Sequence, residues 1–275
     1  RVKKVQEVKQ ISQLPLLGAI PKVTQLSPTV IVDAYIDENL LNDQNVSFTE
    51  ALRSLAMNLR YLNKQEAKAQ VLAITSASPG EGKSTITYNL ALVMAELGIR
   101  VLVVDANMRN PAIHQLAQQN NDTGLSTLLS NNRSWSEYIR PGKVSRFELI
   151  TAGPTHYNPV SLLNSEKMKQ LISEWRKAYD YVLLDTPTIG ITADVQTFIG
   201  ETDSVVLVSG MEKASRKAIN RAMEVLGLST NSLAGLVVNL VDKTDEHYDY
   251  LYDAVQYDRH VFENNNRRPQ VSGSI

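Results

Sequence analysis

The chain of 275 residues contains no cysteine, which excludes disulfide bonds, a cysteine nucleophile and metal sites with cysteine ligands. It has four scattered histidines, which argues against a His-rich metal site. Neither sign of charge dominates, because 28 Lys and Arg face 29 Asp and Glu, so no global field favours nucleic acid. No apolar run approaches the ~20 residues that a membrane-spanning helix requires. A hydrophobic fraction of 43% at this length fits one large α/β domain or two small ones.

The apolar pattern divides the chain into three regions. Residues 1–46 mix prolines with short apolar patches, which predicts an irregular arm, and residues 243–275 lose the apolar period, which predicts a flexible tail. Residues 47–242 form the predicted domain, which opens with a capping box at Ser47 to Glu50 and leucines at helical spacing. The basic residues around Arg1 fit either a solvated chain end or the cytoplasmic flank of a membrane helix.

Short aliphatic runs alternate with segments of helical spacing through the predicted domain. The predicted strands are Val71–Thr75, Val101–Asp105, Phe147–Thr151, Tyr181–Asp185, Ser204–Val208 and Leu233–Val238. The predicted helices cover Lys83 to about Leu97, Pro159 to Ala178 behind a cap at Asn158, and Ser215 to Leu226 before Gly227. This alternation predicts an α/β fold with a mostly parallel sheet and helices on both faces.

A glycine-containing loop joins the first predicted strand to the helix after it. It reads Ser76-Ala77-Ser78-Pro79-Gly80-Glu81-Gly82-Lys83-Ser84-Thr85. Such a loop points backbone N–H groups and a helix N-terminus at one spot, as a polyphosphate requires. Lys83 is then placed to reach the β- and γ-phosphates, and the Ser84 hydroxyl to bind Mg²⁺. Ala77 replaces the first glycine of the usual pattern, and no G-x-G-x-x-G of an oxidoreductase follows the strand.

Two further predicted strands each end in an aspartate. Asp105 closes one and Asp185 closes the other. The carboxyl edge of an open α/β sheet is where ligands bind, and Mg²⁺ prefers carboxylate oxygens. A lone aspartate at a strand end is usually a turn or cap residue. Two of them beside a lysine loop predict a site for a nucleotide with Mg²⁺.

These residues resemble the bacterial tyrosine kinases, the P-loop NTPase-like cytoplasmic domains of polysaccharide co-polymerases of the Wzc type, over about residues 12–258. Residues 76–85 resemble the Walker A motif of that family, 101–109 its A′ motif and 183–187 its Walker B motif. The resemblance implies an ATP-dependent tyrosine autokinase that regulates the chain length and export of an exopolysaccharide or capsule. It implies ATP or ADP and Mg²⁺ as ligands, at the cytoplasmic face of the bacterial inner membrane. The implied partners are further copies of the chain, a transmembrane chain-length-determinant segment on the same or a separate chain, and a tyrosine phosphatase, without nucleic acid.

The resemblance also implies roles for individual residues. Those that would hold the nucleotide are Pro79, Gly80, Glu81, Gly82, Lys83, Ser84 and Thr85, with Asn239 at the adenine ring. The catalytic residues would be Lys83, Asp105 and Asp185, and the metal ligands Ser84, Asp105 and Asp185. Asp105 is the candidate acceptor of the tyrosine proton. Asn107 and Arg109 would support this site. Asn107 stands where the family has an aspartate, and its uncharged amide supports Mg²⁺ less well, which predicts reduced activity.

Family members assemble into rings through a Glu-x-x-Arg-x-x-Arg helix. Here Glu50 and Arg53 match it, and Ala56 replaces the second arginine, which predicts weakened assembly. A capping box and a solvated helix face explain the same two residues without assembly. The phosphoacceptors implied by the resemblance are Tyr248, Tyr250, Tyr252 and Tyr257, modified in the site of the next subunit. An amphipathic segment packed on the domain is the other interpretation of that cluster.

Two other functions fit parts of the sequence. Asn107, Ala56 and the small number of tail tyrosines fit a pseudokinase that binds ATP and regulates polysaccharide assembly without catalysis. A partitioning ATPase of the MinD/ParA class shares the predicted fold. Its signature lysine would stand at the position of Ser78, however, and serine cannot reach the nucleotide of a partner.

Overall fold

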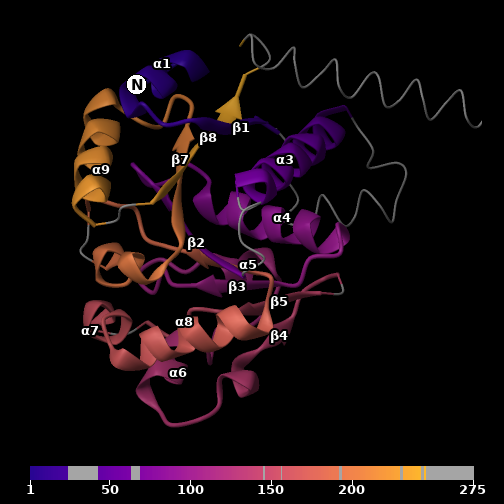
Figure 1. Cartoon of the computed structure of the whole chain (residues 1–275), viewed down its shortest axis with the longest axis vertical. Coiled ribbons are helices and arrows are strands. Elements are labelled where there is room, and N and C mark those ends of the chain that lie inside the picture. The colour runs from indigo at the N-terminus through magenta and orange to yellow at the C-terminus, as the bar shows by residue number, and fades with distance from the viewer. Residues whose placement is uncertain are drawn as a thin grey trace, which may run out of the picture.

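The computed structural model describes residues 1–23, 43–62, 69–144, 146–155, 157–191, 194–229, 232–242 and 245. Strands in these residues form one sheet in the order β1-β8-β7-β2-β6-β3-β5-β4 (Figure 1). The strands are β1 Leu16–Pro21, β2 Gln70–Ser76, β3 Val101–Asp105, β4 Arg140–Pro141, β5 Phe147–Ile150, β6 Tyr181–Asp185, β7 Ser204–Gly210 and β8 Leu233–Val241. All neighbours pair in parallel except β4 and β5. The predicted α/β fold is confirmed.

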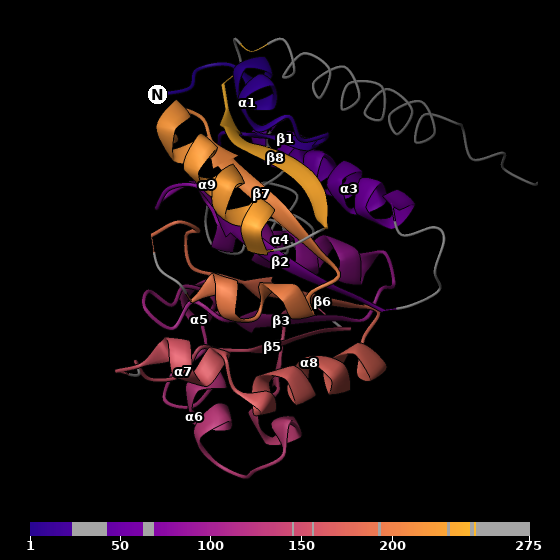
Figure 2. The same ribbon diagram turned by 60° about the vertical axis from the view of Figure 1, so that its left-hand side comes forward.

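Helices cover both faces of this sheet. They are α1 Val5–Ser12, α3 Asp43–Leu62, α4 Lys83–Glu96, α5 Ile113–Leu116, α6 Leu125–Ser130, α7 Pro159–Leu163, α8 Glu166–Ala178 and α9 Arg216–Ser229. Figures 1 and 2 show α3 and α4 on one side and α9 on the other. Helix α1 packs beside α9, and α6 to α8 continue that layer toward β5. Within the described residues, no helix is both long and apolar enough to cross a bilayer.

The central strands are buried on both faces. In β2, Leu72 and Ile74 join the core beneath α3 and α4, whereas Val71 and Ala73 face the opposite layer. Because every position of such a strand is buried, its sequence is a continuous apolar run. All six predicted strands are therefore confirmed, with boundaries shifted by at most three residues.

The irregular arm predicted for residues 1–46 is wrong for its first half. Helix α1 forms, and β1 extends the sheet by pairing Leu16 with Leu236 of β8. Leu17 and Ile20 of β1 are buried against α3. The arm also contacts the far end of the domain, where the Val2 N–H donates to the Ala214 carbonyl at 3.1 Å. Pairing with a strand more than 200 residues away leaves no periodic signal in a six-residue run, so local pattern could not predict it.

Three predicted helix boundaries are also wrong. Helix α3 begins at Asp43, so Ser47 lies inside it and forms no capping box. The helix predicted from Pro159 to Ala178 is two helices, because the Ser165 hydroxyl caps α8 by accepting the Met168 N–H at 3.2 Å. Helix α9 continues through Gly227 to Ser229. Glycine tolerates both helical and left-handed backbone, so tertiary packing overrides it as a stop signal.

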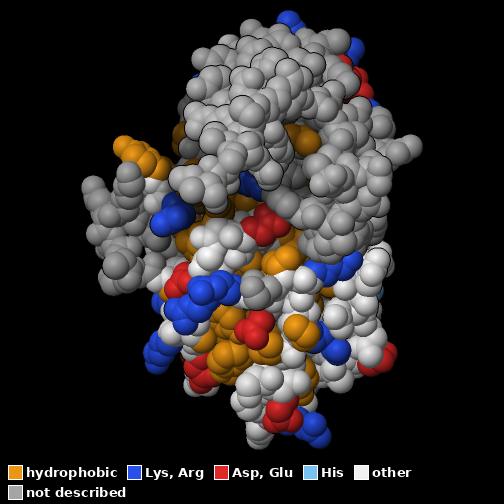
Figure 3. Space-filling view, turned by 90° about the vertical axis from the view of Figure 1, so that its right-hand side faces the viewer, with side chains coloured by type: hydrophobic (Ala, Val, Ile, Leu, Met, Phe, Trp, Pro, Cys, Tyr) orange, Lys and Arg blue, Asp and Glu red, His pale blue; other side chains and the backbone are white. Residues whose placement is uncertain are grey.

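The surface carries charges of both signs. On the face drawn in Figure 3, Lys and Arg side chains alternate with Asp and Glu side chains and with hydrophobic atoms over the described part. No single-sign patch dominates that part of the face, in keeping with the formal net charge of −1.

Candidate functional site

The loop between β2 and α4 has the backbone of a phosphate-binding loop. Gly80 and Gly82 have φ angles of 75° and 88°, in the left-handed region that favours glycine. Gly82 is the N-cap of α4 and offers no side chain to cap the helix. A fourteen-residue helix thus directs the N–H groups of its first turn, and the positive end of its dipole, toward the space above the loop. A helix N-terminus of this kind favours a bound anion.

Asp185 lies at the end of β6, in register with Asp105 on the neighbouring β3. The residue is fully buried, and among the described residues neither of its carboxylate oxygens has a hydrogen-bond partner. Burial raises the pKa of Asp185 to about 6, while the Lys83 charge and the Ser84 hydroxyl lower it. An unsatisfied buried carboxylate is costly, which indicates that it serves a ligand. The sequence-predicted Lys83, Ser84 and Asp185 are thus brought together.

Asp105 is placed differently from Asp185, because its carboxylate is satisfied by the chain itself. Its Oδ2 accepts the N–H groups of Ala112 and Ile113, both at 3.0 Å, and its Oδ1 accepts the Asn107 N–H at 3.1 Å. Burial and the nearby Asp185 nevertheless raise the pKa of Asp105 to about 7. These bonds fix the loop between β3 and α5, so Asp105 has the turn role that is usual for an aspartate at a strand end.

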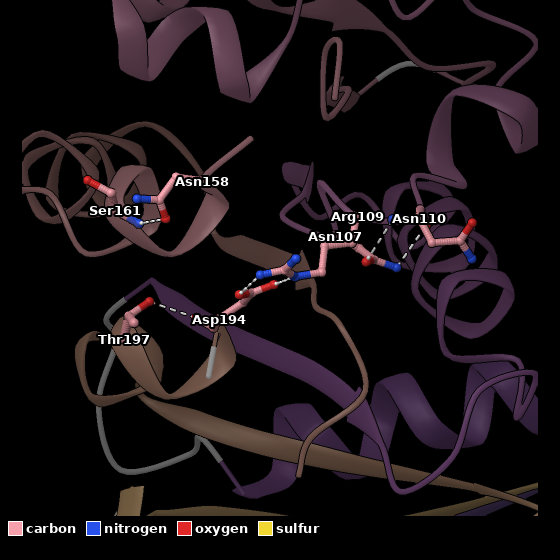
Figure 4. Close-up of polar contacts among 7 residues, drawn as sticks. All are labelled: Asn107, Arg109, Asn110, Asn158, Ser161, Asp194 and Thr197. Atoms are coloured by element: carbon pink, nitrogen blue, oxygen red, sulfur yellow. Dashed lines mark hydrogen bonds and ion pairs between the residues drawn. The ribbon is translucent and has the colours of Figure 1, made fainter. Parts of the chain in front are cut away.

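The loop after β3 is held by two further polar contacts, drawn in Figure 4. The Asn107 amide donates to the Asn110 carbonyl at 2.8 Å and accepts the Asn110 N–H at 3.3 Å. Arg109 forms a bidentate pair with Asp194, at 2.6 and 3.0 Å, in which the Asp194 side chain is 1% exposed. An aspartate at position 107 could not donate to Asn110, so the amide here stabilises the turn. Whether it reduces activity stays a prediction.

Asn239 is directed at the loop itself. Its side-chain N–H donates to the Glu81 carbonyl at 2.9 Å, and the residue is buried. A Cβ on Gly82 would lie 2.2 Å from the Asn239 Nδ2. Contact with an adenine ring stays a prediction for Asn239.

A cavity of about 700 Å³ opens beside Gly80. Part of its wall is formed by Met211, which follows β7, and by Leu240, which lies near the end of β8. Its basic lining residues are Arg1, Lys3, Lys4, Lys22 and Lys213. The first half of the chain's arm therefore borders the candidate nucleotide site, which the sequence did not indicate.

The residues expected at a subunit contact have partners within the chain. Glu50 and Arg53 form an ion pair one turn apart in α3, and Arg53 lies 3.9 Å from Glu96 at the end of α4. These contacts leave ring assembly a prediction. The tail tyrosines at positions 248, 250, 252 and 257 lie outside the described residues.

We expect Gly82→Ala to abolish nucleotide binding, because the new methyl group would overlap the Asn239 amide and the φ angle of 88° is strained for alanine. Gly80→Ala is the matched control, since its φ angle is 75° and nothing lies within 4 Å of the added Cβ. Calorimetric titration with Mg-ADP measures the nucleotide affinity of both variants. A Gly82→Ala protein that binds as well as the control would contradict this geometry.

Comparison with known proteins identifies the family. The family described as AAA domain matches residues 69–251. The tyrosine-protein kinase YwqD of Bacillus subtilis is 35% identical over 204 residues, which cover 74% of this chain and 85% of YwqD. The putative tyrosine-protein kinase CapB of Staphylococcus aureus is 31% identical over 74% of this chain and 90% of its own length. The crystal structure of the chimerical protein CapA2B2 superposes with a TM-score of 0.76 at 28% identity, over 86% of this chain and 99% of that one. With a P-loop, two strand-end aspartates and these relatives, the chain belongs to the bacterial protein-tyrosine kinases and has their P-loop NTPase-like fold.

Proposed function

We propose that the chain transfers the γ-phosphoryl group of ATP to tyrosine hydroxyls, and that its acceptors are Tyr248, Tyr250, Tyr252 and Tyr257 of a neighbouring copy. The observation that carries this proposal is the carboxylate of Asp185, which has no hydrogen-bond partner among the described residues and is buried beside Lys83 and the N-terminus of α4. Phosphoryl transfer depends mainly on positioning and on neutralising charge, and this arrangement supplies both.

The triphosphate would lie over the loop, with the N–H groups from Gly80 to Thr85 as donors and the Lys83 ammonium at the β- and γ-phosphates. The base and ribose would extend into the cavity bordered by Met211 and Leu240. Asn239 and Glu81 would act there by holding the loop in shape.

The residues at the strand ends fit Mg²⁺. Within the described part of the chain both carboxylate oxygens of Asp185 are buried without a hydrogen-bond partner, which suits a hard cation with its water ligands, and the Ser84 hydroxyl lies beside them. When bound, Mg²⁺ would neutralise charge on the phosphate oxygens. Asp185 and Ser84 would hold it, and Asp105 would contribute from the neighbouring strand.

Asp105 is the proposed acceptor of the tyrosine proton. Its pKa of about 7 suits a general base at neutral pH. Three N–H groups occupy its carboxylate in this conformation, so the loop after β3 would have to move to expose it. This requirement is what favours the second candidate, a regulator that binds ATP without transferring phosphate.

Beyond phosphoryl transfer, we propose that the chain regulates the length and export of an exopolysaccharide. It would act at the cytoplasmic face of the membrane with a transmembrane chain-length determinant, on the same or a separate chain, and a tyrosine phosphatase would reverse its modification. The family membership and the basic residues of the arm support this proposal.

The decisive experiment incubates the purified chain with Mg-ATP and maps phosphotyrosine by mass spectrometry. We expect modification of the cluster at positions 248–257 and its loss when these tyrosines are replaced by phenylalanine. Mixing a tail-intact chain that lacks Lys83 with an active, tail-deleted chain tests transfer between copies. Mg-ATP binding without phosphotyrosine would favour the regulator, and hydrolysis with nucleotide-driven dimerisation would favour the partitioning class.

A further inference from the structure

We propose that Glu81 is a positioning residue whose carboxylate ties the phosphate-binding loop to the end of β7 and thereby sets the affinity of the site for nucleotide. The inference rests on the proposed function. It assigns Glu81 a role in which its carboxylate does not contact the phosphates, because like charges would repel each other there.

The contacts of Glu81 span two segments of the chain. Its Oε2 accepts the Ser78 N–H at 2.6 Å, within the loop, and its Oε1 accepts the Gly210 N–H at 3.4 Å, at the last residue of β7. The residue is 1% exposed, so the side chain points into the protein. One carboxylate therefore joins the first half of the loop to a strand more than 120 residues further along the chain.

A third contact holds the same residue from β8. The Asn239 side chain donates to the Glu81 carbonyl, so the main chain and the side chain of Glu81 are both fixed. The approach is close, because a Cβ added to Gly210 would lie 3.0 Å from the Glu81 Cα. The loop is thus held from the β7–β8 side, next to the N–H groups that would bind phosphate.

Each of the two hydrogen bonds from Ser78 and Gly210 needs an accepting oxygen on the Glu81 side chain. Glutamine keeps one oxygen and replaces the other by an NH₂ group, which would face an N–H group and repel it. Burial raises the pKa of Glu81 to about 7, whereas the N–H groups of Ser78, Gly210 and Ala77 and the charge of Lys83 lower it. Burying the Glu81 carboxylate costs free energy of desolvation. We attribute its retention to the loop conformation that its hydrogen bonds stabilise.

The test compares wild type with Glu81→Gln by calorimetric titration of Mg-ADP and by initial rates of tyrosine phosphorylation. We expect about a tenfold rise in the Kd for Mg-ADP and in the KM for ATP, with kcat at saturating ATP within about twofold of wild type. The matched control is Glu148→Gln on β5. It removes the carboxylate that accepts a hydrogen bond from the Tyr179 hydroxyl. It should lower stability and leave the Kd unchanged.

A second variant protects the test against misfolding of the first. Gly210→Ala keeps Glu81 and displaces it through the added methyl group, and it should raise the Kd in the same direction. An unchanged Kd in either folded variant would overturn the inference, as would a loss confined to kcat. If wild type binds Mg-ADP but makes no phosphotyrosine, the proposed function fails while the effect of Glu81 on the Kd is still measured.

Discussion

Lys83→Met is expected to lower the rate of tyrosine phosphorylation by at least ~100-fold, the scale seen when one group that stabilises transition-state charge is removed. Lys83 is the first residue of α4 and is half-buried, and its charge acts on the Asp185 carboxylate, which is where the proposed function places the phosphates. Methionine keeps the length of the side chain and its helix propensity but removes the charge. Phosphotyrosine mapping after incubation with Mg-ATP measures the effect.

The control for this variant is Lys217→Met, which removes an exposed lysine from the first turn of α9. Lys217→Met should unfold at nearly the wild-type temperature, because the Lys217 side chain forms no hydrogen bond or ion pair in the described residues. Lys83→Met should be somewhat less stable at neutral pH, because it removes the charge that lowers the pKa of the buried Asp185. Phosphotyrosine at the wild-type rate in Lys83→Met would show that the loop does not hold the transferred phosphate, and the proposed function would fail.

Asp185→Asn is expected to stabilise the unliganded chain by about 1–3 kcal/mol at pH 8 while abolishing Mg²⁺-dependent binding. The magnitude follows from a pKa of about 6 against an ordinary value of 3.8, at about 1.4 kcal/mol for each pKa unit. A buried carboxylate without a partner opposes folding when it is charged, and asparagine removes that charge with little change of shape. Thermal unfolding without nucleotide measures the stability, and titration with Mg-ADP measures the binding.

The same carboxylate gives the stability a defined pH dependence. The pKa values of Asp185 and Asp105 are raised in the folded state, to about 6 and about 7, so the folded chain holds more protons than the unfolded one in this range. The stability of the unliganded wild type should therefore rise as the pH falls from about 7 to about 4. Asp185→Asn should flatten this dependence, because it removes one titrating group and the charge that raises the pKa of the other.

Asp194→Asn is the matched control for Asp185→Asn. Asp194 is also a buried aspartate, but Arg109 satisfies both of its oxygens, so its neutralisation should destabilise the chain by about 1–3 kcal/mol. Opposite signs for the two variants are the expected result. Destabilisation by both would mean that Asp185 has a partner in solution and is not reserved for a ligand.

Residues close together in the sequence were predicted well. The strand, glycine loop and helix around Lys83 follow each other within thirty residues, and the aspartates end apolar runs that are buried on both faces. Both features are local, because chain connectivity and burial pattern fix them without knowledge of the fold. The arm was predicted wrongly because its strand pairs with β8, more than 200 residues away. The capping box at Ser47 was a local prediction that was also wrong, because α3 begins four residues earlier.

By itself, the sequence determined the α/β class, the phosphate-binding loop and the two strand ends that carry its aspartates. The tertiary structure determined which of the two aspartate carboxylates has hydrogen-bond partners among the described residues. Register between β3 and β6 brings the two aspartates together, but the loop after β3 satisfies Asp105, whereas Asp185 has no hydrogen-bond partner in the residues that the structure describes. Hydrogen bonds likewise join Glu81 to the ends of the distant strands β7 and β8. Such contacts join segments separated by scores of residues, and a linear pattern does not record how those segments are placed in space.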